Sequence, residues 1–204
     1  MSILHEIIDW LKSQSILEVF GVITGILCVY LAAKNNILNW PIAIISVSIY
    51  IIIFWETKLY ADAGLQVYFF LMNAYGWYFW SKKSNQNKKV PVNRINNKEI
   101  IFSVMAIIVF TAALGFMLKK GTDASFPFID SFCTVCSLVG QIFLARKVLE
   151  NWLIWIFVDL IYVGVYLAKG LNLTAGMYAL YIYIALAGYL TWRKEYKAYQ
   201  LNSN

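Results

Sequence analysis

Apolar residues follow one another in long runs along the chain, and most charged residues lie between the runs. A helical run of about 20 residues, at 1.5 Å per residue, is long enough to cross a hydrocarbon core of about 30 Å. Backbone groups in lipid must bond to one another, and the period-two alternation of a membrane β-barrel is absent, so each run is expected to be helical. The predicted transmembrane helices are 16–33, 37–55, 60–80, 99–118, 125–145, 149–168 and 171–192.

The pattern also repeats itself at a constant offset of 112 residues, without gaps, from about 18–80 to 130–192. The matching positions are Asn39-Trp40 with Asn151-Trp152, Tyr50 with Tyr162, Leu59 with Leu171, Ala63-Gly64 with Ala175-Gly176, Gly76 with Gly188, and Trp80 with Trp192. Equivalent helices are four spans apart, so they cross the membrane in the same direction. We therefore predict an all-α integral membrane protein with seven transmembrane helices, in which two parallel three-helix repeats are joined by a linker helix, a 3+1+3 order like that of the SWEET carriers.

The segments outside the repeats complete the predicted organisation. Residues 1–15 carry apolar positions at helical spacing together with acidic residues, which is typical of an amphipathic surface helix rather than a cleavable signal. The first repeat covers 16–80 and the second 125–192. A polar, basic segment covers 81–98 and is expected to be a solvated loop. The linker helix and the loop after it cover 99–124, and a tail covers 193–204.

Basic residues predict the orientation of the chain. The side that holds the amino terminus carries five Lys and Arg residues, and the side that holds the 81–98 loop and the tail carries twelve. The positive-inside rule therefore places the loop and the carboxyl terminus in the cytoplasm and the amino terminus outside. This topology accounts for the net charge of +6, so the charge gives no reason to expect nucleic-acid binding.

The linker helix differs from the other six in having few polar side chains. Between 100 and 118 its polar residues are only Ser103 and Thr111, so we expect it to face lipid. Alternatively, this helix could form an interface between copies of the chain, because it carries the small residues Ala106, Ala112, Ala113 and Gly115.

Composition and motifs narrow the function classes. The chain is 61% hydrophobic and 14% charged, far from the values of soluble domains. Cys133 and Cys136 have CxxC spacing inside a span, but no His or further Cys accompanies them, so we expect packing roles and no metal site. A phosphate-binding loop and a nucleophile–base constellation are both absent from the sequence, so neither a cofactor nor enzymatic activity is predicted.

Polar and aromatic side chains within the spans form the candidate site, because polar groups in hydrocarbon normally face a bundle interior or a watery cavity. Two helices each present such residues on one face at helical spacing. The candidate substrate-binding residues are Gln66, Phe70, Asn73, Trp77, Trp152, Trp155, Asp159, Tyr162, Tyr178, Tyr181 and Trp40. Aromatic rings, amides and one carboxylate suit a flat, hydroxylated, cationic organic solute. Two alternatives stay open: Gln66, Asn73 and Asp159 as links between helices, and the tryptophans near span ends as interface anchors.

Two segments carry a resemblance to a known family. LYADAGLQVYFFLMNAYGWYFW (59–80) and ENWLIWIFVDLIYVGVYLAKG (150–170), together with GYLTW (188–192), resemble the PnuC family of bacterial vitamin transporters over roughly 16–192. The resemblance implies a 3+1+3 helical fold, a homotrimer, and an inner-membrane location. It also implies facilitated diffusion of an unphosphorylated B-type vitamin, followed by trapping by a cytosolic vitamin kinase.

The resemblance departs from the family at one place that bears on the substrate. Nicotinamide riboside carriers often have Asn followed three residues later by Ser in the sixth span, where this chain has Asp159 and Tyr162. Nicotinamide riboside and thiamine are both cations with an aromatic ring and a hydroxyl, so Asp159 does not distinguish between them. The resemblance implies nicotinamide riboside as the substrate and leaves thiamine as the alternative. A proton-coupled transporter that uses Asp159, and a membrane enzyme or scaffold, are the competing classes.

Overall fold

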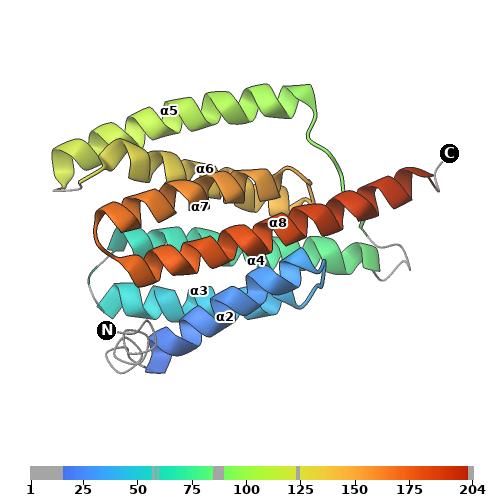
Figure 1. Cartoon of the computed structure of the whole chain (residues 1–204), viewed down its shortest axis with the longest axis horizontal. Coiled ribbons are helices and arrows are strands. Elements are labelled where there is room, and N and C mark those ends of the chain that lie inside the picture. The colour runs from blue at the N-terminus through green and yellow to red at the C-terminus, as the bar shows by residue number, and fades with distance from the viewer. Residues whose placement is uncertain (1–15, 57, 59, 85–89, 123–124, 202–204) are drawn as a thin grey trace.

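The computed structural model describes residues 16–56, 58, 60–84, 90–122 and 125–201. These residues form long α-helices that lie side by side (Figure 1). The helices are α2 (Ile16–Ala33), α3 (Asn39–Glu56), α4 (Tyr60–Ser84), α5 (Asn97–Gly121), α6 (Pro127–Ala145), α7 (Asn151–Ala168) and α8 (Asn172–Leu201). The predicted amphipathic helix over 1–15 lies outside the described residues.

The helices coincide with the predicted spans, but two of them extend further into polar sequence. Helix α4 continues to Ser84 and α8 to Leu201, so part of the predicted loop and most of the predicted tail are helical. Among the described residues, five segments are long and apolar enough to cross a membrane; they are α3, α5, α6, α7 and Thr174–Leu201. The described apolar stretch of α2, Val19–Ala33, is shorter, and α4 is rich in polar and aromatic residues.

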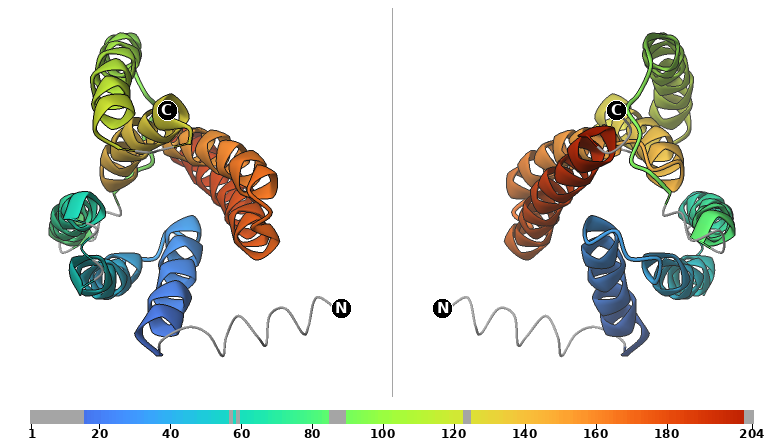
Figure 2. Two further views of the ribbon diagram at one scale, coloured as in Figure 1. Left: turned by 90° about the vertical axis from the view of Figure 1, so that its left-hand side faces the viewer. Right: turned by 90° about the vertical axis from the view of Figure 1, so that its right-hand side faces the viewer.

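Six of the helices form a closed ring. Each contacts the next in the order α2, α3, α4, α6, α7, α8, and α8 returns to α2. Helix α5 lies outside this ring and packs mainly on α6, as the end-on views of Figure 2 show. The ring thus encloses an interior that all six helices can line.

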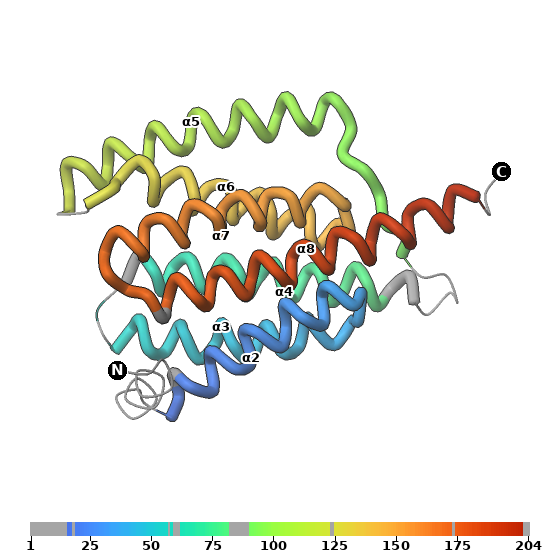
Figure 3. Tube along the Cα trace, in the orientation of Figure 1, coloured from blue at the N-terminus to red at the C-terminus, as the bar shows by residue number. Residues whose placement is uncertain are grey.

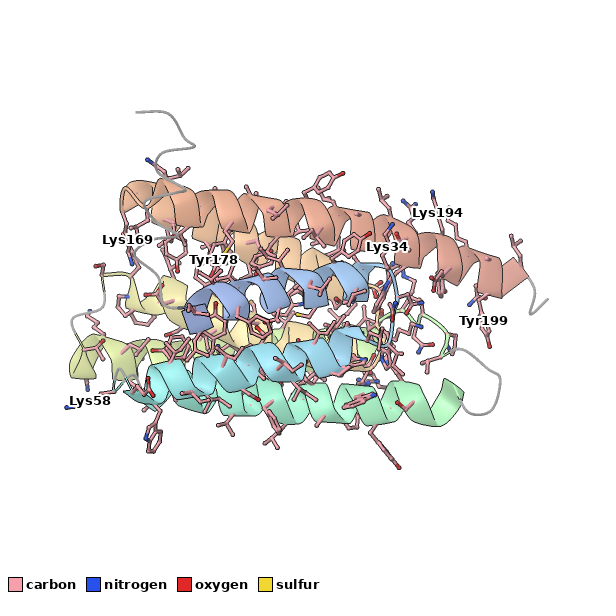
Figure 4. All side chains as sticks on the ribbon, turned by 90° about the horizontal axis from the view of Figure 1, so that it is seen from below. Lys34, Lys58, Lys169, Tyr178, Lys194 and Tyr199 are labelled. Atoms are coloured by element: carbon pink, nitrogen blue, oxygen red, sulfur yellow. The ribbon has the colours of Figure 1, made fainter. Side chains whose placement is uncertain are left out.

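Lysines mark the two ends of the bundle. Figure 4 places Lys34 and Lys194 toward one end, which we call the basic end, and Lys58 and Lys169 at the other, which we call the far end. The tube in Figure 3 shows the chain passing between these ends from helix to helix.

Loop conformations recur at the offset of the sequence repeat. Asn35 and Lys147 both have positive φ, 56° and 60°, in the turns that follow α2 and α6. At the far end, Lys58 and Gly170 share a second such conformation, with φ of 61° and 73°. The two copies of the sequence therefore adopt the same turns.

Four tryptophans form a buried cluster at the basic end. The ring centroids of Trp40 and Trp80 are 5.2 Å apart, those of Trp152 and Trp192 are 5.5 Å apart, and both pairs meet edge to face. Trp80 and Trp192 join the pairs at 5.9 Å. Since all four are at most 4% exposed, this tryptophan cluster fills the ring at the basic end.

Two glycines let the cluster pack closely. A Cβ on Gly76 would lie 2.5 Å from the ring of Trp40, and one on Gly188 would lie 2.7 Å from the ring of Trp152. Such distances leave no room for a methyl group, which explains the glycine at both repeated positions.

A strap of residues 90–96 covers the turn after α6. Lys147 donates from Nζ to the carbonyl oxygen of Val90 at 2.7 Å and lies 4.8 Å from the ring centroid of Trp80. Asn93 exchanges backbone hydrogen bonds with Lys147 and Leu149 at 2.9 and 2.8 Å. The sequence pattern predicted a solvated loop here. The prediction is wrong for this part of the loop, because Val90 and Val92 are buried.

Candidate functional site

A cavity of about 380 Å³ lies inside the ring and is lined from all six of its helices. Trp152, Ala32 and Asn39 bound it toward the basic end, where the tryptophan cluster fills the ring. Its size falls in the range of small-molecule sites, about 300–1,000 Å³. A small organic molecule enclosed here would meet side chains of every helix in the ring.

One wall of the cavity carries amide groups. Gln141 of α6 donates from Nε2 to Oδ1 of Asn73 of α4 at 2.8 Å, and both side chains are buried. Gln66 lies two turns before Asn73 and lines the same cavity. The amide hydrogens of Asn73 and the carbonyl oxygen of Gln141 keep capacity for further bonds, so this wall can bind hydroxyl groups.

The next helix around the ring, α7, brings a carboxylate to the cavity. Asp159 of α7 lines the cavity and is 6% exposed. Within the described residues, the ion pairs are Arg94 with Glu150 and Arg146 with Glu99, so Asp159 has no cationic partner there. A buried carboxylate costs several kcal/mol unless a partner compensates it, so this one favours a cationic ligand.

Tyrosines surround the cavity toward the far end. The ring centroids of Tyr162 and Tyr178 are 5.0 Å apart, and those of Tyr178 and Tyr181 are 6.0 Å apart. Tyr178 lies in the half of α8 nearer to Lys169 (Figure 4). Its ring stacks on Tyr166 with an interplanar angle of 16°. Aromatic faces placed beside a carboxylate add attraction for a flat cation.

Trp152 adds an unused donor to the site. Its indole lines the cavity, and its buried Nε1–H has no acceptor among the described residues. Buried donors are normally satisfied, so this one lacks a partner that most buried N–H groups have.

The structure brings most of the predicted residues together. Eight of the eleven candidates line the cavity; they are Gln66, Asn73, Trp152, Trp155, Asp159, Tyr162, Tyr178 and Tyr181. The other three do not line it. Trp40 lies in the tryptophan cluster, Trp77 is 43% exposed, and Phe70 is half-buried.

The helix period explains the difference on α4. The predicted face ran from Gln66 to Phe70, Asn73 and Trp77, but the face that lines the cavity has Phe69 between Gln66 and Asn73. Spacings of three and four residues both fit a helix face, so the pattern alone could not choose between Phe69 and Phe70.

Sequence reasoning missed some residues of the cavity. Gln141 was not among the predicted site residues, although it is an amide in the middle of a span, as Gln66 is. Ser46 and Ser137 also line the cavity and donate to backbone oxygens of Gly21 and Cys133, at 3.0 and 2.8 Å. Their own oxygens still have capacity to accept hydrogen bonds from a solute.

Cys133 and Cys136 are buried beside Val158. No group of three or more metal-ligating residues occurs in the part of the chain that the structure describes.

Comparison with known proteins shows similarity to membrane transporters. The family model described as nicotinamide mononucleotide transporter matches residues 15–194. The nicotinamide riboside transporter PnuC of Escherichia coli (strain K12) is 32% identical, over 86% of this chain and 84% of its own. The riboflavin/roseoflavin transporter RibM of Streptomyces davaonensis is 26% identical, over 90% of this chain and 92% of its own.

A solved structure shares the fold. The crystal structure of the vitamin B3 transporter PnuC superposes with a TM-score of 0.73 at 24% identity, covering 96% of this chain and 88% of that one. The family match spans nearly all the described helices, including all six that surround the cavity. The chain therefore belongs to the PnuC family of membrane transporters.

Proposed function

We propose that this protein carries nicotinamide riboside across the bacterial inner membrane, and that the central cavity is its binding site. The observation that carries the proposal is the buried Asp159, which has no cationic partner among the described residues and lines one cavity together with aromatic rings and the amides of Gln66, Asn73 and Gln141. Nicotinamide riboside has a cationic ring, which suits the carboxylate and the aromatic rings, and a hydroxylated sugar, which suits the amides. The name of the E. coli relative supports the same substrate.

The carboxylate of Asp159, which has no cationic partner among the described residues, also ranks the other candidate substrates. Thiamine is a cation with an aromatic ring and a hydroxyl, so it is the second candidate. The RibM relative is named for riboflavin, whose ring system is neutral and would leave Asp159 without a counter-charge.

For the mechanism we propose facilitated diffusion by alternating access. The two three-helix units, α2–α4 and α6–α8, would act as parallel repeats joined by the linker helix α5. The recurring turns at Asn35 and Lys147 support this reading, as does the ring order of the helices. The tryptophan cluster closes the basic end, so release toward that side needs the two units to separate there. Phosphorylation by a cytosolic vitamin kinase would then trap the product.

The proposed setting follows the topology and the resemblance. The amino terminus would be outside and the carboxyl terminus in the cytoplasm, and the functional unit would be a homotrimer surrounded by lipid. The basic end would then be the cytoplasmic end.

The test is uptake into liposomes that contain the purified protein, a nicotinamide riboside kinase and ATP. We expect labelled nicotinamide riboside to accumulate without any ion gradient, and liposomes without the kinase to reach only the external concentration. Labelled thiamine, with thiamine kinase inside, is the parallel arm. Uptake of neither cation would refute the proposal, and uptake of thiamine alone would reassign the substrate.

A proton-coupled mechanism is the competing proposal, because a membrane-embedded carboxylate such as Asp159 can carry a proton. Collapsing the proton gradient separates the two mechanisms. Uptake that continues at the same initial rate supports facilitated diffusion, whereas uptake that stops supports proton coupling.

A further inference from the structure

A second cavity lies outside the ring, between the linker helix α5 and helix α6. It has a volume of about 790 Å³, and Tyr68 of α4 is also among its lining residues. Figures 1 and 3 show that α5 and α6 approach each other where the chain passes from one to the other, and separate toward the basic end. The space between them is therefore a wedge, which we call the α5–α6 groove.

Aromatic packing closes the narrow end of the groove. Gly115 of α5 has no side chain, and the ring of Phe128 of α6 occupies the space where a Cβ would lie. Phe116 meets the same ring edge to face, with centroids 5.3 Å apart. The groove is thus sealed near the far end.

The walls of the groove are apolar over a depth that matches one membrane leaflet. They include Phe102, Ala106 and Phe110 of α5, and Val135 and Leu138 of α6. On α6 the lining runs from Val135 to Arg146, about 17 Å at the helical rise of 1.5 Å per residue. Half of a hydrocarbon core of about 30 Å has nearly the same depth.

The open end of the groove carries a net positive charge. Lys98, Glu99 and Arg146 form its rim. Arg146 donates from Nη2 to Oε1 of Glu99 at 2.5 Å, and its side chain is 44% exposed, so some of its five N–H donors remain available. The exposed Lys98 makes no ion pair within the described residues. One cation therefore remains uncompensated where the groove reaches the headgroup level.

We propose that the α5–α6 groove binds an anionic phospholipid, with one acyl chain in the wedge and the phosphate against Lys98 and Arg146. A flexible chain can fill a space that narrows to the width of a side chain. A helix of a second copy cannot enter it, because α5 and α6 already touch at the apex. The walls are largely apolar, with Tyr68 and Ser103 as the polar exceptions, so they would satisfy few of the vitamin's hydroxyl groups.

The direct test is native mass spectrometry of the purified protein with phosphatidylglycerol or phosphatidylcholine. We expect phosphatidylglycerol to remain bound, one per chain, at collision energies that remove phosphatidylcholine. Each basic residue near a membrane surface contributes roughly fivefold to the attraction of an anionic lipid. The double variant Lys98→Gln, Arg146→Gln should therefore bind phosphatidylglycerol at least tenfold more weakly.

Matched variants make the test specific. Lys98→Gln alone breaks no bond in the described structure, so weaker binding in this variant cannot be attributed to loss of the Arg146–Glu99 pair. Lys119→Gln with Lys120→Gln makes the same charge change at the other end of α5 and should leave lipid binding unchanged. Ala106→Trp fills the groove and should remove the bound lipid of either kind.

Two outcomes would overturn the proposal. One is equal retention of phosphatidylglycerol by the wild-type protein and the double variant. The other is that Ala106→Trp changes the oligomeric state while the lipid stays bound, which would identify the groove as an interface between copies of the chain.

Discussion

At the residue scale, the site depends on polar side chains whose burial in a membrane is energetically unfavourable. Asp159 has no counter-charge within the described structure, and Gln141 and Asn73 satisfy each other only in part. Such groups are retained in hydrocarbon mainly where they meet a solute or a partner. The cavity supplies the place for a solute to do so.

The repeated glycines give a prediction about packing at the same scale. Gly76→Ala should destabilise the protein by about 1–3 kcal/mol, because the added methyl group would overlap the ring of Trp40. Gly64→Ala is the matched control in the same helix, since nothing lies within 4 Å of its Cβ position. Thermal unfolding in detergent measures both, and equal midpoints for the two variants would contradict the packing argument.

Residue-level features of the site were predictable only in part. The mid-span polar residues Gln66, Asn73 and Asp159 stood out because lipid does not solvate them. The helix period could not distinguish Phe69 from Phe70. A tryptophan near the end of a span can be an interface anchor or a buried residue, and the sequence did not show that Trp40 lies in the core. Side-chain direction depends on which neighbour each helix packs against, and a single sequence does not contain that information.

At the scale of elements, hydrophobic runs located all seven described helices because a span must be both long and apolar. The ends of α4 and α8 were missed because helices continue into polar sequence once they leave the membrane. The strap of residues 90–96 was missed because two buried valines within a basic loop form too short a pattern.

The strap gives the prediction that belongs to this scale. Lys147→Met should destabilise the basic end by about 1–3 kcal/mol, since it removes the bond to Val90 and leaves that buried carbonyl without this donor. Lys194→Met removes the same charge from an exposed position and should have little effect. Hydrogen exchange at residues 90–96 is the measurement. Unchanged protection in Lys147→Met would mean that the strap does not depend on this lysine.

At the scale of the whole molecule, the ring of six helices could not be predicted from the sequence, although the repeat suggested two equivalent units. Ring closure depends on contacts of α4 with α6 and of α8 with α2, between segments far apart in the chain. It brings the separate polar faces together around one cavity. The tryptophan cluster bounds this cavity at one end, and the proposed function makes the cavity the binding site of the transporter.

Orientation is the prediction for the whole molecule. In a background with Cys28, Cys133 and Cys136 replaced by alanine, Lys169→Cys should react with a membrane-impermeant maleimide in intact cells. Lys194→Cys, at the basic end, should react only after lysis, because the positive-inside rule places that end in the cytoplasm. The reverse pattern of labelling would invert the proposed direction of uptake.

The central claim is that the cavity recognises a cationic vitamin through Asp159, and a binding titration of nicotinamide riboside to the purified protein tests it most directly. Asp159→Asn should weaken binding about tenfold or more, because a bond to a charged group contributes about 1.5–3 kcal/mol. Asp130→Asn, in the first turn of α6 and outside the cavity lining, should bind like the wild-type protein. Equal affinities for wild-type and Asp159→Asn proteins would contradict the account.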